Sequence, residues 1–326
     1  MDWSGQIPWL MMVSISAQRC SSRGSSACSI SRLNLGWIGY APNGRRSKRT
    51  IRLKSAAPDH QSSASWTISK RDLRLLPVET EKVWNFLRDQ SALNGFVLIG
   101  GSALALTIRH RKSEDLDFVY PEVRLPRQRL AAFTESARAS GFGFERNDNE
   151  AAVEDFTLGG MELHDYQQDF LVNGLVKISF FATDDALRKV LQSAGGDGKV
   201  RVASLSELFR AKCLVSAVRS KTRDWLDLYL LMRDHGFTIF DYRSTFQHAG
   251  IPHQCDIGLT RLCSGIPQRD DEGYAHLLQN PPTLEEMRAF FVQERGKLEV
   301  ETAADALRRK QITTGKSDRS NRQSEN

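Results

Sequence analysis

The chain has 326 residues, 40% of them hydrophobic, which suffices for one large domain or two modest ones and is too polar for a membrane protein. The formal net charge is +6, but residues 1–65 hold nine Lys/Arg and two acids, leaving 36 bases and 37 acids in the remainder. The positive excess therefore belongs to the N-terminal segment, and the overall charge gives no argument that the rest of the chain binds nucleic acid.

Cysteine usage excludes two further classes. The five cysteines are odd in number and form no C-x-x-C pair, so neither a disulfide framework nor a zinc site is indicated. The spacing of His253, Cys255 and Cys263 matches no set of metal ligands. A reducing, cytoplasmic location is expected. The cysteines are Cys20, Cys28, Cys213, Cys255 and Cys263.

Residues 1–65 are rich in Ser, Arg and Gly without a sustained period, which predicts a disordered basic leader. The apolar run 7–13 is too short to span a bilayer and has no basic segment before it, so a secretory signal is not favoured. A start codon assigned too early, an organellar transit peptide and a basic arm on nucleic acid are the alternative interpretations.

Residues 68–94 are predicted to form two helices separated by Pro77, because apolar residues recur at spacings of three, four and seven. The apolar run 96–99 then predicts a buried strand that ends at Gly100 and Gly101. Ser102 is a suitable N-cap for a helix over 103–108, and residues 115–120 alternate acidic and apolar side chains as a second strand would.

The two acids of this second strand point to a metal. Asp115 and Asp117 share one face because strand residues i and i+2 do, while Leu116 and Phe118 face the core. Adjacent carboxylates repel unless a cation lies between them, and Mg²⁺ binds one or two carboxylates together with substrate phosphates. The Gly100-Gly101-Ser102 turn offers free N–H groups to a phosphate. This combination suits nucleotidyl transfer.

The string from Gly100-Gly101-Ser102 to Asp115-Leu116-Asp117-Phe118 resembles the polymerase-β-like nucleotidyltransferase superfamily. With the intervening residues it resembles one branch, the AbiEii/AbiGii toxin nucleotidyltransferases, over about residues 66–240. The resemblance implies that Arg111 and Ser113 belong to the nucleotide-binding site. The purely structural alternative is a strand–helix–strand unit whose acids are merely solvated.

Further along, a helix is predicted over 127–140 and short strands over 142–146, 153–158, 161–164 and 175–181. The superfamily often has a third acid on a neighbouring strand. Here the matching positions are Lys177 and Ser179, which lowers the expectation of a two-metal mechanism, and Asp184 or Asp185 could substitute.

Residues 200–203 are predicted to form a short strand, and Ser204 to Glu207 has the spacing of a capping box that opens a helix to about residue 219. A second helix follows over 223–231. This segment also resembles the AbiEii-like branch, and the resemblance implies that Lys212 contacts the nucleotide phosphates. It further implies that Asp224 orients the acceptor hydroxyl or acts as a base and that Asp227 holds the basic residues. Ion pairs along exposed helices are the alternative.

The predicted fold is α/β (or α+β), with a small mixed sheet flanked by helices. The predicted organisation is a leader over 1–65, a nucleotidyltransferase domain over 66–240, a helical part over 241–310 and a disordered tail over 311–326. Amphipathic helices are expected over 285–309.

The resulting hypothesis is a Mg²⁺-dependent nucleotidyltransferase that moves a nucleoside monophosphate from an NTP to an RNA or tRNA end or to a protein. The resemblance implies a toxin with a cognate antitoxin, from a toxin–antitoxin or phage-defence system. A small-molecule nucleotidyltransferase of the antibiotic-modifying kind and a degenerate nucleotide-binding module without activity remain as alternatives.

Overall fold

The computed structural model describes residues 75–191 and 200–323, with side chains described to residue 309. The predicted leader, the first part of the helix predicted from residue 68, and Cys20 and Cys28 lie outside these residues. Six strands form one mixed sheet in the order β3-β4-β5-β2-β1-β6. The strands are β1 (Val97–Ile99), β2 (Leu116–Tyr120), β3 (Phe144–Arg146), β4 (Gln167–Val172), β5 (Val176–Ala182) and β6 (Arg201–Val202).

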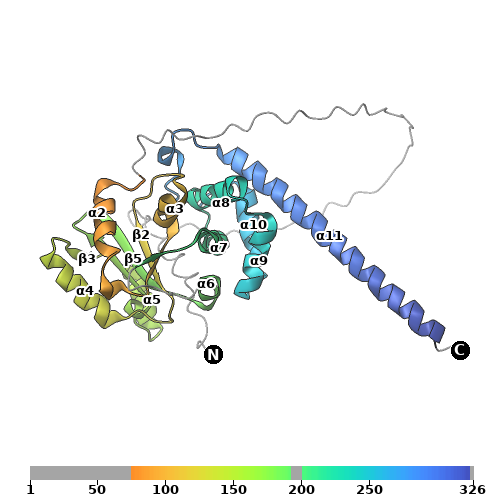
Figure 1. The fold of residues 1–326 in the computed structure, drawn as a ribbon, viewed down its shortest axis with the longest axis horizontal. Helices are drawn as coiled ribbons and strands as arrows, with labels where there is room; N and C mark the ends of the chain where they lie inside the picture. Colours follow the sequence, from red (N-terminus) through yellow and green to blue (C-terminus); the bar gives the residue numbers. More distant parts are fainter. Residues whose placement is uncertain (1–74, 192–199, 324–326) are drawn as a thin grey trace, which may run out of the picture. The chain divides into compact units, whose positions relative to one another are not determined.

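Helices cover both faces of this sheet (Figure 1), with α2 and α4 on one side and α7 on the other. The helices are α2 (Val78–Leu87), α3 (Gly100–Ile108), α4 (Arg127–Ala139), α5 (Glu150–Leu158), α6 (Asp185–Val190), α7 (Leu205–Ser216), α8 (Thr222–Asp234), α9 (Ile239–Ala249), α10 (Gln254–Ser264) and α11 (Leu284–Gln323). Short 3₁₀ turns are η2 (Ser91–Leu93), η3 (Leu163–Asp165) and η4 (Ala275–Leu277). The mixed α/β class expected from the sequence is confirmed.

The centre of the sheet carries the core. Strand β2 pairs antiparallel with β1 and parallel with β5, and β5 pairs antiparallel with β4. On the face toward α2, Phe118 stacks on Phe180 and lies against Trp84. The same alternation leaves the polar side chains of β2, β5 and β4 on the opposite face, where the cavity described below is found.

The helix predicted from Ser204 forms as α7. The Ser204 hydroxyl accepts a hydrogen bond from the Glu207 N–H, and the Glu207 carboxylate accepts one from the Ser204 N–H. Arg201 also pairs with the fully buried Glu207 through its Nη1, at 2.7 Å. This anchoring fixes where α7 starts and hence the position of Lys212 two turns later.

Two predicted strands are wrong. Residues 153–158 belong to helix α5, because the Asn149 side chain caps it at Ala151 N and its buried residues, Ala152 and Phe156, are four apart. Residues 161–164 lie in a loop and the start of η3 rather than in a strand. The strand that pairs antiparallel with β5 is instead β4, which the sequence pattern did not single out.

The C-terminal helices share one core with the sheet. Leu259 of α10 and Phe291 of α11 belong to the same buried cluster as Phe118 and Leu228. A boundary at residue 240 therefore separates two parts of one packed unit. Helix α11 continues to Gln323, through most of the region predicted as a disordered tail. No helix in the described ranges is both long and apolar enough to cross a membrane.

Candidate active site

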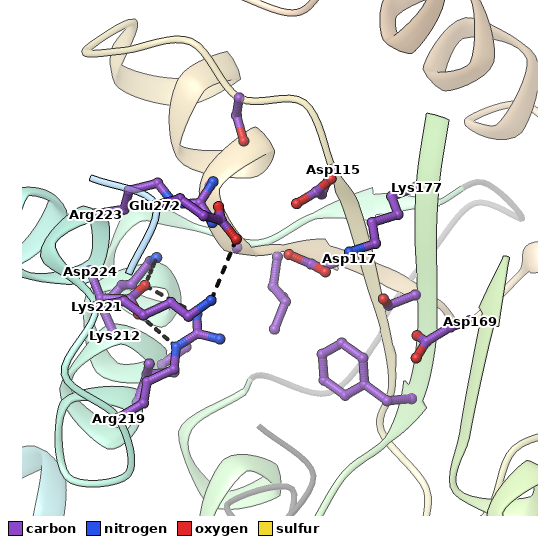
Figure 2. A pocket seen from close by; sticks show the side chains of 18 of the residues that line it. Asp115, Asp117, Asp169, Lys177, Lys212, Arg219, Lys221, Arg223, Asp224 and Glu272 are labelled. Carbon is purple, nitrogen blue, oxygen red and sulfur yellow. Dashed lines mark hydrogen bonds and ion pairs between the residues drawn. The ribbon is translucent and has the colours of Figure 1, made fainter. Parts of the chain in front are cut away.

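A cavity of about 270 Å³ lies between the polar face of the sheet and helices α7 and α8. This volume is near the lower end of small-molecule sites. Figure 2 shows that carboxylates from the sheet face a group of basic side chains from α7, α8 and the turn between them. The cavity therefore has one acidic wall and one basic wall.

The acidic wall is centred on Asp115 and Asp117. Asp117 lies in β2 and Asp115 directly before it, and both are half-buried and line the cavity. Their neighbours Leu116 and Phe118 are fully buried on the other face, as the alternation predicts. Burial and then the adjacent charge of Asp115 raise the pKa of Asp117 to about 6. A cation between the two carboxylates would relieve this strain on the charged form.

The glycine turn meets this acid pair directly. Gly100 has φ +78°, and a Cβ at this position would collide with the Asp117 carboxylate. A Cβ on Gly101 would lie 2.7 Å from Arg111 Nη2 and 2.8 Å from Ser113 Oγ. Helix α3 begins at Gly100, so its first N–H groups have no intrahelical acceptor. Both glycines line the cavity, where an anion can approach this backbone.

Ser102 has a different position from the one expected. It is not an N-cap, because α3 already starts at Gly100. Its residue is fully buried, and its hydroxyl donates a hydrogen bond to the Asp115 carbonyl oxygen. Ser102 therefore holds the backbone before β2 in place and does not reach the cavity.

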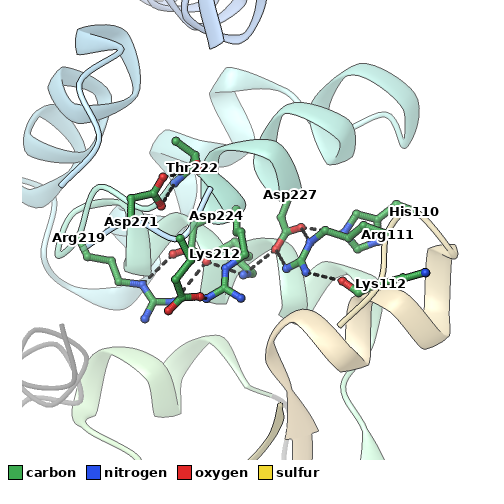
Figure 3. A network of polar contacts seen from close by, with 11 residues as sticks. His110, Arg111, Lys112, Lys212, Arg219, Thr222, Asp224, Asp227 and Asp271 are labelled. Carbon is green, nitrogen blue, oxygen red and sulfur yellow. Dashed lines mark hydrogen bonds and ion pairs between the residues drawn. The ribbon is translucent and has the colours of Figure 1, made fainter. Parts of the chain in front are cut away.

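A buried polar network links the segment directly after α3 to α7 and α8 (Figure 3). Its centre is Asp227, which is fully buried. Arg111 donates two hydrogen bonds to this carboxylate, from Nε to Oδ1 at 2.7 Å and from Nη2 to Oδ2 at 2.9 Å. His110 Nε2 lies 2.7 Å from Oδ1 and Lys212 Nζ 2.7 Å from Oδ2. Burial alone would raise the pKa of Asp227, but the charges of Arg111 and Lys212 outweigh it and hold that pKa well below the ordinary range.

The network continues through Lys212 to Asp224. Lys212 Nζ lies 2.6 Å from Asp224 Oδ1, and Arg219 Nε lies 2.7 Å from Asp224 Oδ2. Burial opposes ionisation of Asp224, yet Arg219 and Lys212 lower its pKa strongly. A carboxylate in this state is a weak base, and its two oxygens are occupied by cations. The geometry thus favours a role in holding Lys212 and Arg219 over the role of base.

An acid outside the expected motifs reaches the basic wall. Glu272, in the segment between α10 and α11, pairs with Arg223 and lies 3.7 Å from Lys221 Nζ. Its neighbour Asp271 fixes this segment by accepting hydrogen bonds from the N–H and hydroxyl of Thr222 at the start of α8. Glu272 is thereby held at the cavity, although its side chain is 58% exposed. No sequence pattern identified it, because it meets its partners only through folding.

Asp169 is a further acid of the cavity that sequence reasoning missed. In the sheet, Asp117 pairs with Ser179 and Ser179 with Asp169, so the three residues form one row across β2, β5 and β4. The expected acid position on β5 is indeed occupied by Ser179, and the acid lies one strand further away. Burial raises the pKa of Asp169. Asp184 caps α6 and Asp185 pairs with Arg188, so neither lines the cavity.

The donor set fits one divalent cation on two carboxylates. Within residues 75–191 and 200–323, no group of three or more His, Cys, Asp or Glu side chains could hold a metal ion. Asp115 and Asp117 still suit Mg²⁺, because phosphate oxygens and water complete its octahedral shell. The described cysteines, Cys213, Cys255 and Cys263, are free thiols.

Comparison with known proteins gives one family. Residues 85–317 match the family described as "Nucleotidyl transferase AbiEii toxin, Type IV TA system". No curated protein matches. Among solved structures, a protein described as a nucleotidyltransferase from H. pylori is 18% identical with a TM-score of 0.38, and the match covers 68% of this chain and 95% of that one. The Megavirus polyadenylate synthase is 14% identical with a TM-score of 0.32, over 48% of this chain and 30% of that one.

The raised pKa of Asp117 predicts a stability cost in the absence of a divalent cation. A carboxyl whose pKa is higher in the folded state destabilises the fold above that pKa, and the cost develops as pH rises from about 4 to about 6. In EDTA at pH 7.5, Asp117→Asn should raise the free energy of unfolding by about 1–2 kcal/mol, discounted for partial exposure. Denaturant titrations should show this gain at pH 7.5 and not at pH 4. The exposed Asp155→Asn on α5 is the control, and equal stability of Asp117→Asn and wild type at pH 7.5 would contradict the prediction.

Proposed function

The chain belongs to the AbiEii nucleotidyltransferase toxin family, and from this premise we propose that it transfers a nucleoside monophosphate from an NTP to a macromolecular acceptor, with Mg²⁺ held by Asp115 and Asp117. That it is a nucleotidyltransferase follows from the family. The nucleotide site, the metal, the acceptor and the biological role are the proposed parts.

One observation carries the proposal: the half-buried carboxylates of Asp115 and Asp117, at the start of β2, face, across a single cavity, the basic side chains of α7 and α8. A triphosphate that is to react needs both the carboxylates and the basic side chains. Its oxygens require positive charge and N–H donors, while its α-phosphorus has to lie beside the metal-binding acids. A cavity with only one kind of charge would bind either the metal or the phosphates, but would not bring them together.

The phosphates are assigned to the end of the cavity formed by the glycine turn and the basic wall. The backbone of Gly100 and Gly101 offers N–H donors at the start of α3. Lys212 contributes a positive charge that Asp224 and Asp227 hold in position. Arg219, about one quarter exposed, extends this charge into the cavity. The side chains of Arg111 and Ser113 pack against this turn at Gly101.

Magnesium, when bound, supplies the charge that draws the triphosphate onto the acids and neutralises its α-phosphate. Asp115 and Asp117 then orient the phosphate relative to the acceptor. We assign the hydroxyl proton of the acceptor to Asp169, which lines the cavity on the side away from Arg219 and Lys221. Asp224 suits this role less, because Arg219 and Lys212 pair with its two oxygens and lower its pKa. The acceptor oxygen bonds to the α-phosphorus as pyrophosphate leaves.

The acceptor is an RNA end, such as that of tRNA, or a protein hydroxyl, and the biological role is that of the toxin in a toxin–antitoxin pair. The role follows from the printed family description alone.

Transfer is tested by incubating the full chain with each of the four α-labelled NTPs and Mg²⁺. Total tRNA, cell protein and an aminoglycoside serve as separate acceptors. Label on RNA or protein is expected, and Asp115→Asn and Asp117→Asn should each lose about 10²-fold or more of the rate, because each removes charge at the reacting phosphate. The exposed Asp155→Asn should retain the rate. Label only on the aminoglycoside would assign a small-molecule transferase, and bound NTP without transfer would reject the proposal.

Glu272 should weaken nucleotide binding, because its carboxylate pairs with Lys221 and Arg223. These two side chains belong to the basic wall to which the phosphates are assigned. Glu272→Gln is expected to lower the Kd for NTP about two- to fivefold at low salt, the range of an exposed ion pair, with the effect fading as salt increases. Isothermal titration with and without 0.5 M salt measures it. Glu285→Gln, which removes another exposed, ion-paired glutamate, should bind like wild type. A higher Kd for Glu272→Gln would instead make Glu272 a nucleotide contact.

A further inference from the structure

The side of the cavity opposite the basic wall carries its own set of polar side chains. This wall is formed by β4, β5 and the segment between β3 and α5, and its lining residues are Asn147, Gln167, Asp169, Lys177 and Ser179. Figure 2 shows Asp115 and Asp117 between this wall and the basic one, with Lys177 and Asp169 on the far side of the acids from Arg219 and Lys221.

The direction of the reaction assigns the acceptor to this wall, an inference that rests on the proposed function. In phosphoryl transfer the attacking and leaving oxygens lie roughly in line through phosphorus. The pyrophosphate leaves on the side of Lys212 and Arg219, so the acceptor oxygen has to arrive from the opposite side. That side is the β4–β5 wall.

Lys177 is the cation of this wall. It lies two residues before Ser179 on β5 and so shares the face that carries the row Asp117–Ser179–Asp169. Its side chain is exposed at the cavity, and within the described ranges it makes no ion pair or hydrogen bond; its charge acts on Asp169. By contrast, Lys212, Arg219 and Arg223 on the other wall all pair with acids.

The strand beside Lys177 is held firmly. Asp148 Oδ1 accepts the Asp169 N–H at 2.9 Å, and its Oδ2 lies 3.0 Å from His164 Nε2. Gln167 Nε2 donates to Asp169 Oδ2 at 2.7 Å. These contacts fix the distance between the acid row and the segment before α5. An acceptor group bound here would meet a preformed surface.

We propose that the β4–β5 wall is the acceptor subsite and that Lys177 binds a phosphodiester next to the accepting hydroxyl. A lysine ammonium is a compact charge with three donors, suited to a single phosphate. The amides of Asn147 and Gln167 add groups that can hydrogen-bond a base or sugar edge. An acceptor with an anion at a fixed offset from its hydroxyl is the terminal nucleotide of an RNA strand, whereas a protein hydroxyl carries no such neighbour.

The test uses the full chain and two matched RNA oligonucleotides, one natural and one with an uncharged methylphosphonate as its last internucleotide linkage. Lys177→Gln should raise the KM for the natural RNA about tenfold and leave the KM for NTP within twofold. The uncharged linkage should raise the KM of wild type by a similar factor and should change Lys177→Gln little, because both changes remove the same ion pair. Lys177→Arg, which keeps the charge, should recover part of the affinity.

The control is Lys82→Gln, which removes an exposed lysine of α2 outside the cavity. A change in the KM for NTP, or independent effects of Lys177→Gln and the uncharged linkage, would overturn the proposal and assign Lys177 to the acid row alone. Transfer to protein with none to RNA would also overturn it. If wild type transfers to no acceptor at all, the proposed function itself fails, whereas transfer that is indifferent to Lys177 rejects only the subsite.

Discussion

The site depends on one buried anion, the carboxylate of Asp227. It is fully inaccessible to solvent and is bound by Arg111, His110 and Lys212. Removing a charge from water costs several kcal/mol, which only close and well-oriented partners can offset. Asp227 therefore requires that the segment after α3 and the middle of α7 meet at one point of α8. This requirement brings together two stretches that lie about 100 residues apart in the sequence.

The consequence is a cavity whose charges are positioned before any ligand arrives. Lys212 is shared between Asp227 and Asp224, and Asp224 in turn holds Arg219. A long, flexible cation at a surface loses much of its binding energy when it is ordered. Here the protein's own acids hold these cations in place. The same contacts explain why Asp224 is ill-suited as a base: the charges of Arg219 and Lys212 stabilise its ionised form and lower its pKa.

The sequence predicted what depends on neighbouring residues and missed what depends on pairing between strands. The strand–helix–strand unit, the same-facing Asp115 and Asp117 and the capping box of α7 were all local patterns, and the structure contains them. Residues 153–158 alternate enough to suggest a strand, but the Asn149 cap and the spacing of Ala152 and Phe156 produce a helix. Helices α9 and α10 lie almost wholly in the part over 241–310 that was predicted as helical, but no local pattern gave their bounds. Asp169 could not be found, because no spacing in the chain encodes the register that aligns β4 with β5.

The row Asp117–Ser179–Asp169 shows how that register can alter a site without changing the fold. Ser179 occupies the position on β5 where an acid was expected, and the acid of this row, Asp169, lies on β4. Within residues 75–191 and 200–323, Asp169 forms no group of three possible metal ligands with Asp115 and Asp117. Asp169 lies on the side of the cavity from which, under the proposed mechanism, the acceptor approaches. Lys177, two residues before Ser179, then adds a positive charge to a wall that would otherwise repel a phosphate-bearing acceptor. With Ser179 rather than an acid on β5 and Lys177 on the same strand face, the β4–β5 side of the cavity carries less negative charge than the centre with Asp115 and Asp117, which is what the proposed binding of a second anionic substrate requires.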